Sequence, residues 1–158
     1  MKQLSKLITL VCMALCLAAC SNDSEPQAPI TPTPATLNGT WSLAEWNGQP
    51  ANDDWYTYIT FDRLTDTYVM YQRQNSMKSE KKTGSFAIAH DEEAGTYTLS
   101  GTYDYTFGGV WAHDYIITDL QENTMTLTMK DDATDVQKFV RVESVPEDIL
   151  KGTRSALR

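Results

Sequence analysis

Apolar and polar residues alternate along several short segments of this chain. The clearest is the segment TMTLTMK at residues 124–130, in which every second residue is apolar. A period of two places the apolar set on one face of a β-strand and the polar set on the other. Further strand candidates, alternating or rich in Trp, Tyr and other strand-favouring residues, are residues 38–46, 55–63, 67–73, 84–88, 96–100, 111–120 and 136–142.

Short polar segments separate these candidates and have the composition of turns. They are residues 64–66, 90–95, 121–123 and 131–134, and Gly108-Gly109 separates the segment 103–107 from the one that begins at Trp111. No amphipathic helix of useful length stands between the strands. The pattern predicts an all-β fold, an antiparallel up-and-down barrel of about eight strands, with a β-sandwich as the alternative.

The C-terminal segment has a different pattern. Residues 144–147, SVPE, have the form of a capping box with proline at an early helical position. We expect a short helix here, with Ile149 and Leu150 docked on the barrel and Gly152 at its end.

The N-terminal segment is typical of an export signal. It carries Lys2 and Lys6 without any acidic residue, followed by an almost wholly apolar run from Leu7 to Ala19. The run is too short for a transmembrane helix, which needs roughly 20 apolar residues. Residues 17–20, LAAC, resemble the bacterial lipobox, which implies cleavage before Cys20 and three acyl chains on it, palmitate among them.

This resemblance divides the chain and implies a location. We expect a signal peptide at 1–19, a lipidated Cys20 with a proline-rich tether at 20–36, the barrel at 37–143 and a short helix and tail at 144–158. The four prolines of residues 26–36 predict an extended spacer without helix. Acidic Asp23 and Glu25 resemble an address for the outer face of the outer membrane of Gram-negative bacteria, so we expect a lipid anchor there; the inner leaflet is the alternative.

Charge narrows the choice of partners. The formal charge is −8, and loss of the two signal lysines makes it −10. An acidic domain repels nucleic acids. The local cluster Lys78, Lys81 and Lys82 is interpreted as the solvated flank of an edge or loop. With Cys12 and Cys16 removed and Cys20 acylated, no disulfide is expected, and the folded domain is expected to be a monomer.

Two further motifs indicate a family. Residues 39–41 form a Gly-x-Trp in the first strand, and Arg141 stands near the end of the last. In lipocalins, such a Trp and Arg meet at the closed end of the barrel. The chain therefore resembles the lipocalin-like domains of small surface lipoproteins of Gram-negative gut bacteria. The resemblance implies that Arg141 stacks on Trp41; a core Trp without an Arg partner is the alternative.

Catalytic or metal-binding patterns are not evident in the sequence. His90, interpreted as a solvated loop residue, and His113, placed in a strand, lack the spaced partners of a zinc or catalytic site. Asp53-Asp54 and Asp131-Asp132 lack the pattern of a calcium loop and are interpreted as turns. We therefore expect no enzyme activity, no metal and no cofactor.

Aromatic residues are the best candidates for binding, because ligand sites are concave and rich in aromatic side chains. The segment 46–58 is of most interest, since it contains the loop NGQP at residues 47–50, which lies at the open end in lipocalin-like barrels. We predict a binding protein for a small apolar or amphipathic ligand; the alternative is a protein- or glycan-interaction module of a surface uptake or envelope complex, with a filled barrel. The candidate ligand-binding residues are Trp46, Trp55, Tyr56, Tyr58, Tyr71, Tyr105 and Trp111.

Overall fold

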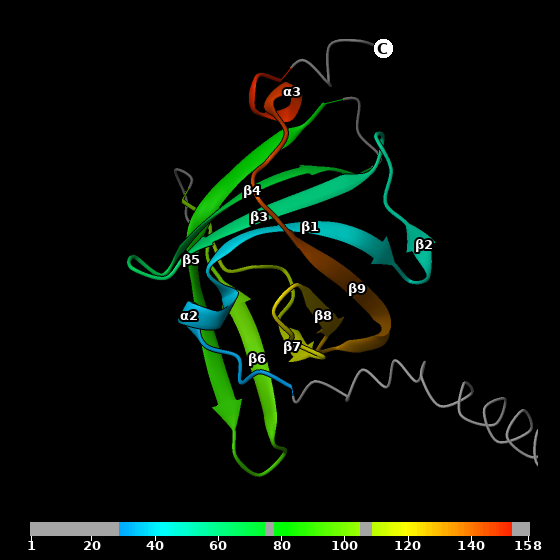
Figure 1. Ribbon diagram of the computed structural model, residues 1–158. Coiled ribbons are helices and arrows are strands. Elements are labelled where there is room, and N and C mark those ends of the chain that lie inside the picture. The colour runs from blue at the N-terminus through cyan, green and yellow to red at the C-terminus, as the bar shows by residue number, and fades with distance from the viewer. Residues whose placement is uncertain (1–28, 75–77, 105–108, 153–158) are drawn as a thin grey trace, which may run out of the picture.

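A computed structural model describes residues 29–74, 78–104 and 109–152. It shows one antiparallel sheet in which β1 pairs with both β3 and β9, so that the sheet closes into a barrel (Figure 1). Eight strands form the barrel, and the short β2 is added beside the end of β1. The predicted all-β, up-and-down barrel is confirmed, and the alternative sandwich is excluded by the closing pair. The strands are β1 (Gly39–Trp46), β2 (Gln49–Pro50), β3 (Tyr56–Asp62), β4 (Thr67–Arg73), β5 (Glu80–Asp91), β6 (Thr96–Gly101), β7 (Tyr115–Thr118), β8 (Thr124–Met129) and β9 (Asp132–Val142).

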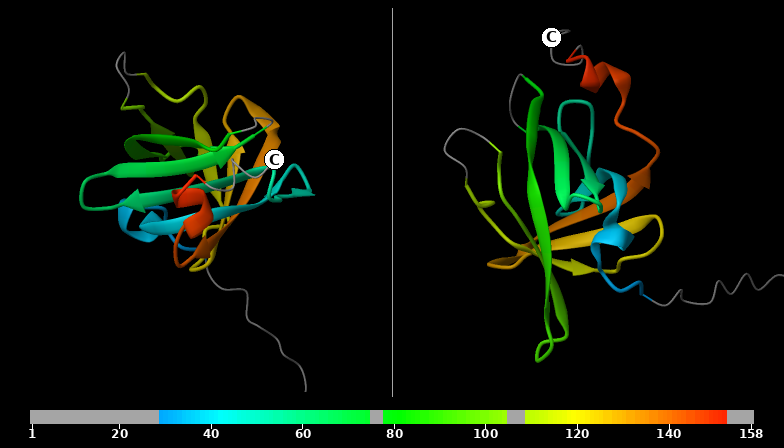
Figure 2. Two further views of the ribbon diagram at one scale, coloured as in Figure 1. Left: turned by 90° about the horizontal axis from the view of Figure 1, so that it is seen from above. Right: turned by 90° about the vertical axis from the view of Figure 1, so that its left-hand side faces the viewer.

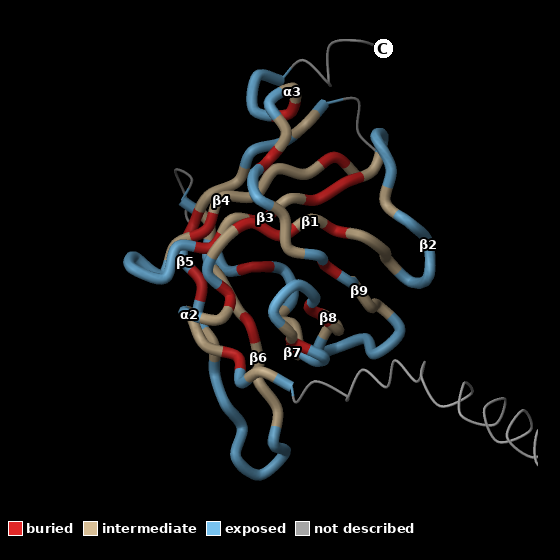
Figure 3. The backbone as a smooth tube through the Cα atoms, in the orientation of Figure 1, coloured by how far each residue is buried: buried red, intermediate tan, exposed pale blue. Residues whose placement is uncertain are grey.

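The hydrophobic core fills the end of the barrel at which β1 begins. Inward-facing side chains from several strands form one cluster there, and Figure 3 shows the buried stretches along these strands. Alternation along each strand supplies one such side chain at every second position. Among the most buried core side chains are those of Trp41, Phe61, Tyr68, Leu99, Met125 and Phe139.

A short helix, α2 (Pro34–Leu37), closes this end of the barrel. Thr33 and Thr36 cap it reciprocally through their hydroxyl groups, and Leu37 is fully buried. The prediction of a helix-free spacer up to residue 36 is wrong here, because proline is tolerated in the first helical turn, where its missing N–H is not needed. Upstream of α2, the N–H of Ile30 donates to the carbonyl of Leu120 at 2.9 Å, so the chain is already packed on the barrel at this point.

The second helix, α3 (Glu147–Leu150), lies on the outer surface of the sheet. The predicted short helix is present, but the predicted capping box is not: the N-cap is Pro146, which makes no side-chain capping bond. Ile149 packs with Val145 against Tyr56, whereas Leu150 is 51% exposed. Only one of the two residues expected to dock therefore does so.

Some strand boundaries differ from those expected. Figure 2 shows β5 as a long strand; its first half pairs with β4 and its second half with β6, so it extends well beyond the predicted 84–88. His90 therefore lies in a strand rather than in a turn, where its ring stacks on Tyr97. The predicted turn at 131–134 is shorter, because β9 begins at Asp132. Of the predicted strand 111–120, only Tyr115–Thr118 pairs as a strand.

Candidate functional site

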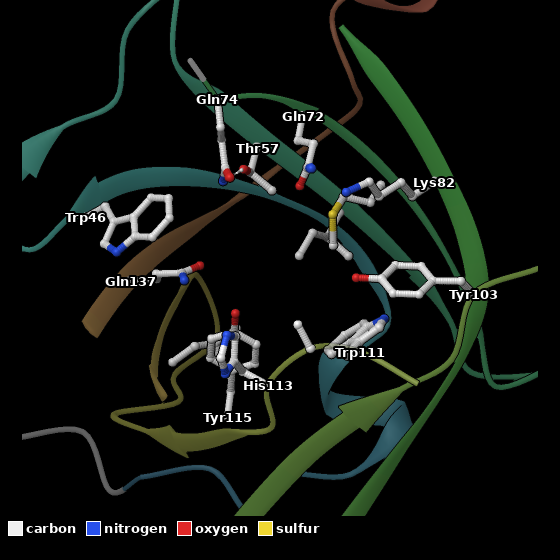
Figure 4. A pocket seen from close by; sticks show the side chains of 14 residues that line it. Trp46, Thr57, Gln72, Gln74, Lys82, Tyr103, Trp111, His113, Tyr115 and Gln137 are labelled. Atoms are coloured by element: carbon white, nitrogen blue, oxygen red, sulfur yellow. Dashed lines mark hydrogen bonds between the residues drawn. The ribbon is translucent and has the colours of Figure 1, made fainter. Parts of the chain in front are cut away.

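A cavity of about 200 Å³ opens at the end of the barrel opposite α2 (Figure 4). Its side chains come from strands far apart in the sequence, between β1 and β9. Apolar side chains from β3, β4 and β8 line part of it: Ile59, Met70 and Leu127. Three aromatic side chains besides Trp111 line it: Trp46, Tyr103 and Tyr115. Its polar side chains are those of Thr57, Gln72, Gln74, Lys82, His113 and Gln137.

A bulge in β1 brings Trp46 into this cavity. Trp41 and Leu43 face the core, so strict alternation would next turn Glu45 inward. The pairing of β1 with β9 shifts register between Leu43 and Glu45, as a bulge does. Glu45 instead pairs with Lys138 at 2.8 Å, and Trp46 lines the cavity. Trp55 stacks on Trp46 with ring centroids 5.2 Å apart and planes at 14°.

The turn after Trp46 is a tight hairpin. Asn47 and Gly48 both have positive φ, 50° and 78°, as the turns that best join two antiparallel strands require. The side chain of Asn47 accepts a hydrogen bond from the N–H of Val136 at 2.7 Å, and its own N–H donates to the carbonyl of Val136 at 2.9 Å. The segment 47–50 follows the cavity-lining Trp46 and so lies at the open end. The two hydrogen bonds hold it against β9.

Trp111 lies against the backbone of β6. A Cβ atom added to Gly101 would stand 2.4 Å from the indole, so only glycine allows this approach. The indole N–H donates to the hydroxyl of Tyr68 at 2.8 Å, and that hydroxyl donates to the carbonyl of Thr102 at 3.0 Å. Trp111 is only 8% exposed, so it forms a fixed part of the cavity wall.

Three glutamine side chains on the cavity wall each donate one hydrogen bond to a neighbour. Gln74 donates to the hydroxyl of Thr57 at 3.3 Å, and Gln137 to the carboxylate of Asp135 at 3.2 Å. Gln72 donates to the carboxylate of Glu80 at a longer 3.5 Å. These contacts orient the amide groups beside the cavity.

Lys82 is the only Lys or Arg side chain among the cavity-lining residues that the structure describes, and the lining there includes no Asp or Glu. Its ammonium group is 3.5 Å from the carboxylate of Glu80 and 5.8 Å from the ring centroid of Tyr103. The interpretation of Lys82 as part of a solvated flank is therefore wrong: strand alternation in β5 turns it inward, toward the mouth of the barrel (Figure 4).

Tyr115 and His113 lie together on one side of the cavity (Figure 4). Burial raises the pKa of the Tyr115 hydroxyl, which is hydrogen-bonded to Gln137, so this hydroxyl is protonated at neutral pH. His113 lies outside the strands, in the segment before β7, and not within a strand as predicted.

The structure brings together only part of the predicted aromatic set. Trp46 and Trp111 line the cavity, and Trp55 contacts it only indirectly, by stacking on the ring of Trp46. Tyr105 lies outside the described residues. Tyr56, Tyr58 and Tyr71 do not line the cavity: they pack beneath α3, on the outside of the barrel.

This separation follows from the phase of alternation in β3 and β4. The cavity is lined by Thr57 and Ile59 of β3 and by Met70 and Gln72 of β4. Because side chains alternate along a strand, Tyr58 and Tyr71 face outward. The polar lining residues were not among the predicted binding residues, because polar residues on a strand are normally assigned to its solvent-exposed face. The phase could have been set from Phe61, which is apolar and two positions from Ile59.

At the opposite end, the side chains of Trp41 and Arg141 are in contact. These two residues are register partners in β1 and β9, and the guanidinium carbon lies 4.1 Å from the ring centroid of Trp41. The arginine also donates to the backbone carbonyls of Thr36, Asn38 and Glu122. The stacking predicted for this pair is present.

Two further features of the described residues bear on the site. No group of three or more His, Cys, Asp or Glu side chains within residues 29–74, 78–104 and 109–152 is arranged to hold a metal ion. None of the helices in these same ranges has the length and apolar character needed to cross a bilayer.

A closed, up-and-down barrel with a filled end and a cavity at the other end defines a class of small binding domains. A comparison with family models agrees: the model of the lipocalin-like domain matches residues 37–127. The chain belongs to this family, whose fold is typically used for binding rather than for catalysis. No curated protein and no solved structure matched the chain.

Proposed function

We propose that this protein binds a small amphipathic molecule in the open end of its barrel and does not transform it chemically. The observation that carries the proposal is the cavity beside Trp46 and Trp111, lined on other sides by amide, hydroxyl and ammonium groups. Small-molecule sites are concave, mostly preformed, and combine aromatic walls with a few placed polar groups. The cavity meets this description.

The shape of the core limits the length of the ligand. Beyond the cavity, the barrel is filled by side chains that are almost fully buried, such as Trp41, Phe61 and Leu99. A long acyl chain has no room to extend toward α2, since protein cores are close-packed. The proposed ligand is therefore compact.

We further propose that the domain is anchored to the outer membrane through an acylated Cys20, with the pocket directed away from the bilayer. Residues 30–38 run along the closed end: Ile30 bonds to Leu120, and the carbonyls of Thr36 and Asn38 accept from Arg141. The chain therefore joins the barrel at the end opposite Trp46. In this arrangement the cavity faces the surroundings of the cell, and a ligand enters it from the side away from the membrane anchor.

An interaction module with a filled barrel is the alternative, in which exposed aromatic residues contact a protein or a glycan. The cavity favours the binding of a small molecule over this alternative. Of the outward-facing tyrosines that could serve as exposed contacts, Tyr56 is buried beneath α3, and Tyr58 and Tyr71 are partly buried there.

Native mass spectrometry of residues 21–158, produced in the native host and purified under mild conditions, tests the binding function. This chain keeps every described residue, and with them the whole sheet and its core. We expect an added mass of one small molecule at near-stoichiometric occupancy. The variant Gln72→Trp fills the cavity and is expected to lose that mass.

The matched control is Thr126→Trp, which introduces the same residue into β8 between the inward-facing Met125 and Leu127, and thus on the outside of the barrel. This variant is expected to retain the bound mass. A bare protein in every preparation, including after incubation with small-molecule extract of the host, would contradict the proposed function.

A further inference from the structure

We propose that the ligand is a single sugar residue, a neutral hydroxylated six-membered ring that lies with one face against Trp46. This inference rests on the proposed binding function and specifies the chemistry of the ligand. It depends on four properties of the cavity: its size, its hydrogen-bonding groups, its charge and its aromatic wall.

The size fits one ring. A cavity of about 150 Å³ in a protein core accommodates a benzene molecule, and the cavity here measures about 200 Å³. One six-membered ring with small substituents therefore fills it. A fatty acid does not, because Trp111 and the packed core below it leave no channel for a long chain.

The hydrogen-bonding groups fit hydroxyls. A glutamine amide has two N–H donors and one carbonyl acceptor, and Gln74 and Gln137 each use one N–H on a neighbour. Gln74 thus keeps a carbonyl and a second N–H to offer the ligand, and Gln137, whose amide is also hydrogen-bonded to the hydroxyl of Tyr115, keeps one of these two groups. Hydroxyl groups both donate and accept, so a ligand with several of them matches walls that present both kinds of group. A hydrocarbon ligand would bury these polar groups without giving them partners, which costs free energy.

The charge fits a neutral ligand. Lys82 carries the single full charge of the described lining and already has Glu80 as its partner at 3.5 Å. An anionic ligand would have to compete with this carboxylate, in a protein whose formal charge is −8. A neutral ligand can accept a hydrogen bond from Lys82 and leave the ion pair intact.

The aromatic wall fits the apolar face of a sugar. Sugar rings present C–H groups on their faces and hydroxyls around their edge, so an aromatic ring can cover a face while polar groups bind the edge. Trp46 is held for this contact: Trp55 stacks on one face of its ring, with centroids 5.2 Å apart, and Trp46 itself lines the cavity. Gln72, Gln74 and Gln137 stand around the same cavity (Figure 4).

Saturation-transfer difference NMR on residues 21–158 tests this inference, because it shows which protons of a bound ligand lie against the protein. The probes are methyl glycosides of neutral hexoses, pentoses and N-acetylhexosamines, with laurate as the apolar comparison. We expect transfer to at least one glycoside, strongest at the ring C–H protons of one face, and none to laurate. The ring protons that receive saturation from the protein then identify the face of the sugar that lies on Trp46.

Two variants locate the binding. Trp46→Ala is expected to abolish the transfer, and Gln72→Leu to weaken the affinity about tenfold, the effect of losing one well-placed hydrogen bond. The control Thr126→Ala, outside the barrel, is expected to bind as the parent does. Gln72→Leu keeps the test valid if removal of Trp46 disturbs the fold.

The outcomes separate this inference from the proposed function. If laurate binds, Gln72→Trp abolishes its binding and no glycoside binds, the sugar is wrong while the binding function stands. Glycoside binding that persists in both Trp46→Ala and Gln72→Leu would place the sugar outside the cavity and would also overturn the inference. If no probe binds and native mass spectrometry shows bare protein, both proposals fail.

Discussion

The guanidinium group of Arg141 covers the indole ring of Trp41, with 4.1 Å between the guanidinium carbon and the ring centroid. The contact joins the last strand of the barrel to the first, at paired positions of β9 and β1. The same guanidinium donates to the carbonyl of Thr36 at 2.9 Å and thereby binds one of the carbonyls that helix α2 leaves without a helical partner. One side chain therefore stabilises the closure of the sheet and the helix that covers its closed end.

Replacing Arg141 by methionine is expected to lower the free energy of unfolding by about 2–4 kcal/mol. The change removes a cation–π contact of about 0.5–2 kcal/mol and charge-assisted hydrogen bonds to three backbone carbonyls. Urea unfolding, followed by tryptophan fluorescence, measures the loss. The control is Lys138→Met, also in β9, which removes only an exposed ion pair with Glu45 and is expected to cost about 0–1 kcal/mol. Equal losses in the two variants would show that Arg141 has no special role.

Substitution of Gly101 by alanine is expected to displace Trp111 and to alter the cavity. The new Cβ would stand 2.4 Å from the indole, closer than any real contact, and overpacking of this kind costs about 1–3 kcal/mol. We also expect the hydrogen bond from Trp111 to Tyr68 to lengthen or break, which shifts the NMR signal of the indole N–H.

The matched control for this substitution is Gly95→Ala, at a turn where nothing lies within 4 Å of the added Cβ. Its φ of +65° makes alanine unfavourable by about 1–2 kcal/mol, but the Trp111 signal is expected to stay in place. If the signal also stayed in place in Gly101→Ala, Trp111 would not depend on the glycine.

Helix α3 is expected to depend on one of its two large apolar residues. Ile149 is 2% exposed against Tyr56 and Val145, so Ile149→Ala is expected to destabilise the protein by about 2–4 kcal/mol through lost contacts and a new cavity. The adjacent Leu150 is 51% exposed, and Leu150→Ala is expected to change stability by less than about 0.5 kcal/mol. Thermal unfolding of both variants provides the comparison, and similar midpoints would mean that α3 does not hold its place on the barrel in solution.

Much of the barrel could be predicted from the sequence, because strand alternation is a local property. The segment 124–130 alternates without exception, and β8 occupies Thr124–Met129 within it. The pairing of Trp41 with Arg141 could be anticipated from a motif at each end of the domain. Both depend on residue types that stand directly in the sequence.

The candidate site could be predicted only in part, because which face of a strand is buried depends on distant partners. Tyr58 and Tyr71 seemed suited to a cavity, yet they face the outside of the barrel and are partly buried against α3, and nothing near them in the sequence indicates this contact. Lys82 carries a charge, which suggested a solvated position, but β5 turns it inward beside Glu80. Trp111 lies outside the strands, and its ring fits against β6 only because Gly101 has no side chain, a relationship between residues that the sequence does not pair.

The first residues of β9 give a prediction about pH. Hydrogen bonds from the hydroxyl and the N–H of Thr134, at 2.7 and 2.9 Å, hold the pKa of the Asp132 carboxyl below its usual range. A lowered carboxyl pKa favours the folded state above the pKa of the unfolded chain, and this contribution is lost as the pH falls through the folded-state pKa.

In Thr134→Val the hydroxyl is absent while the N–H remains, so we expect the Asp132 pKa to rise toward its usual value without reaching it. Thr134→Ser keeps the hydroxyl and is expected to titrate as the parent does. The carboxyl carbon of Asp132, followed by NMR between about pH 2 and 6, a range around the usual aspartate pKa, distinguishes these cases. The same titration curve in the valine and serine variants would show that the hydroxyl does not lower the pKa.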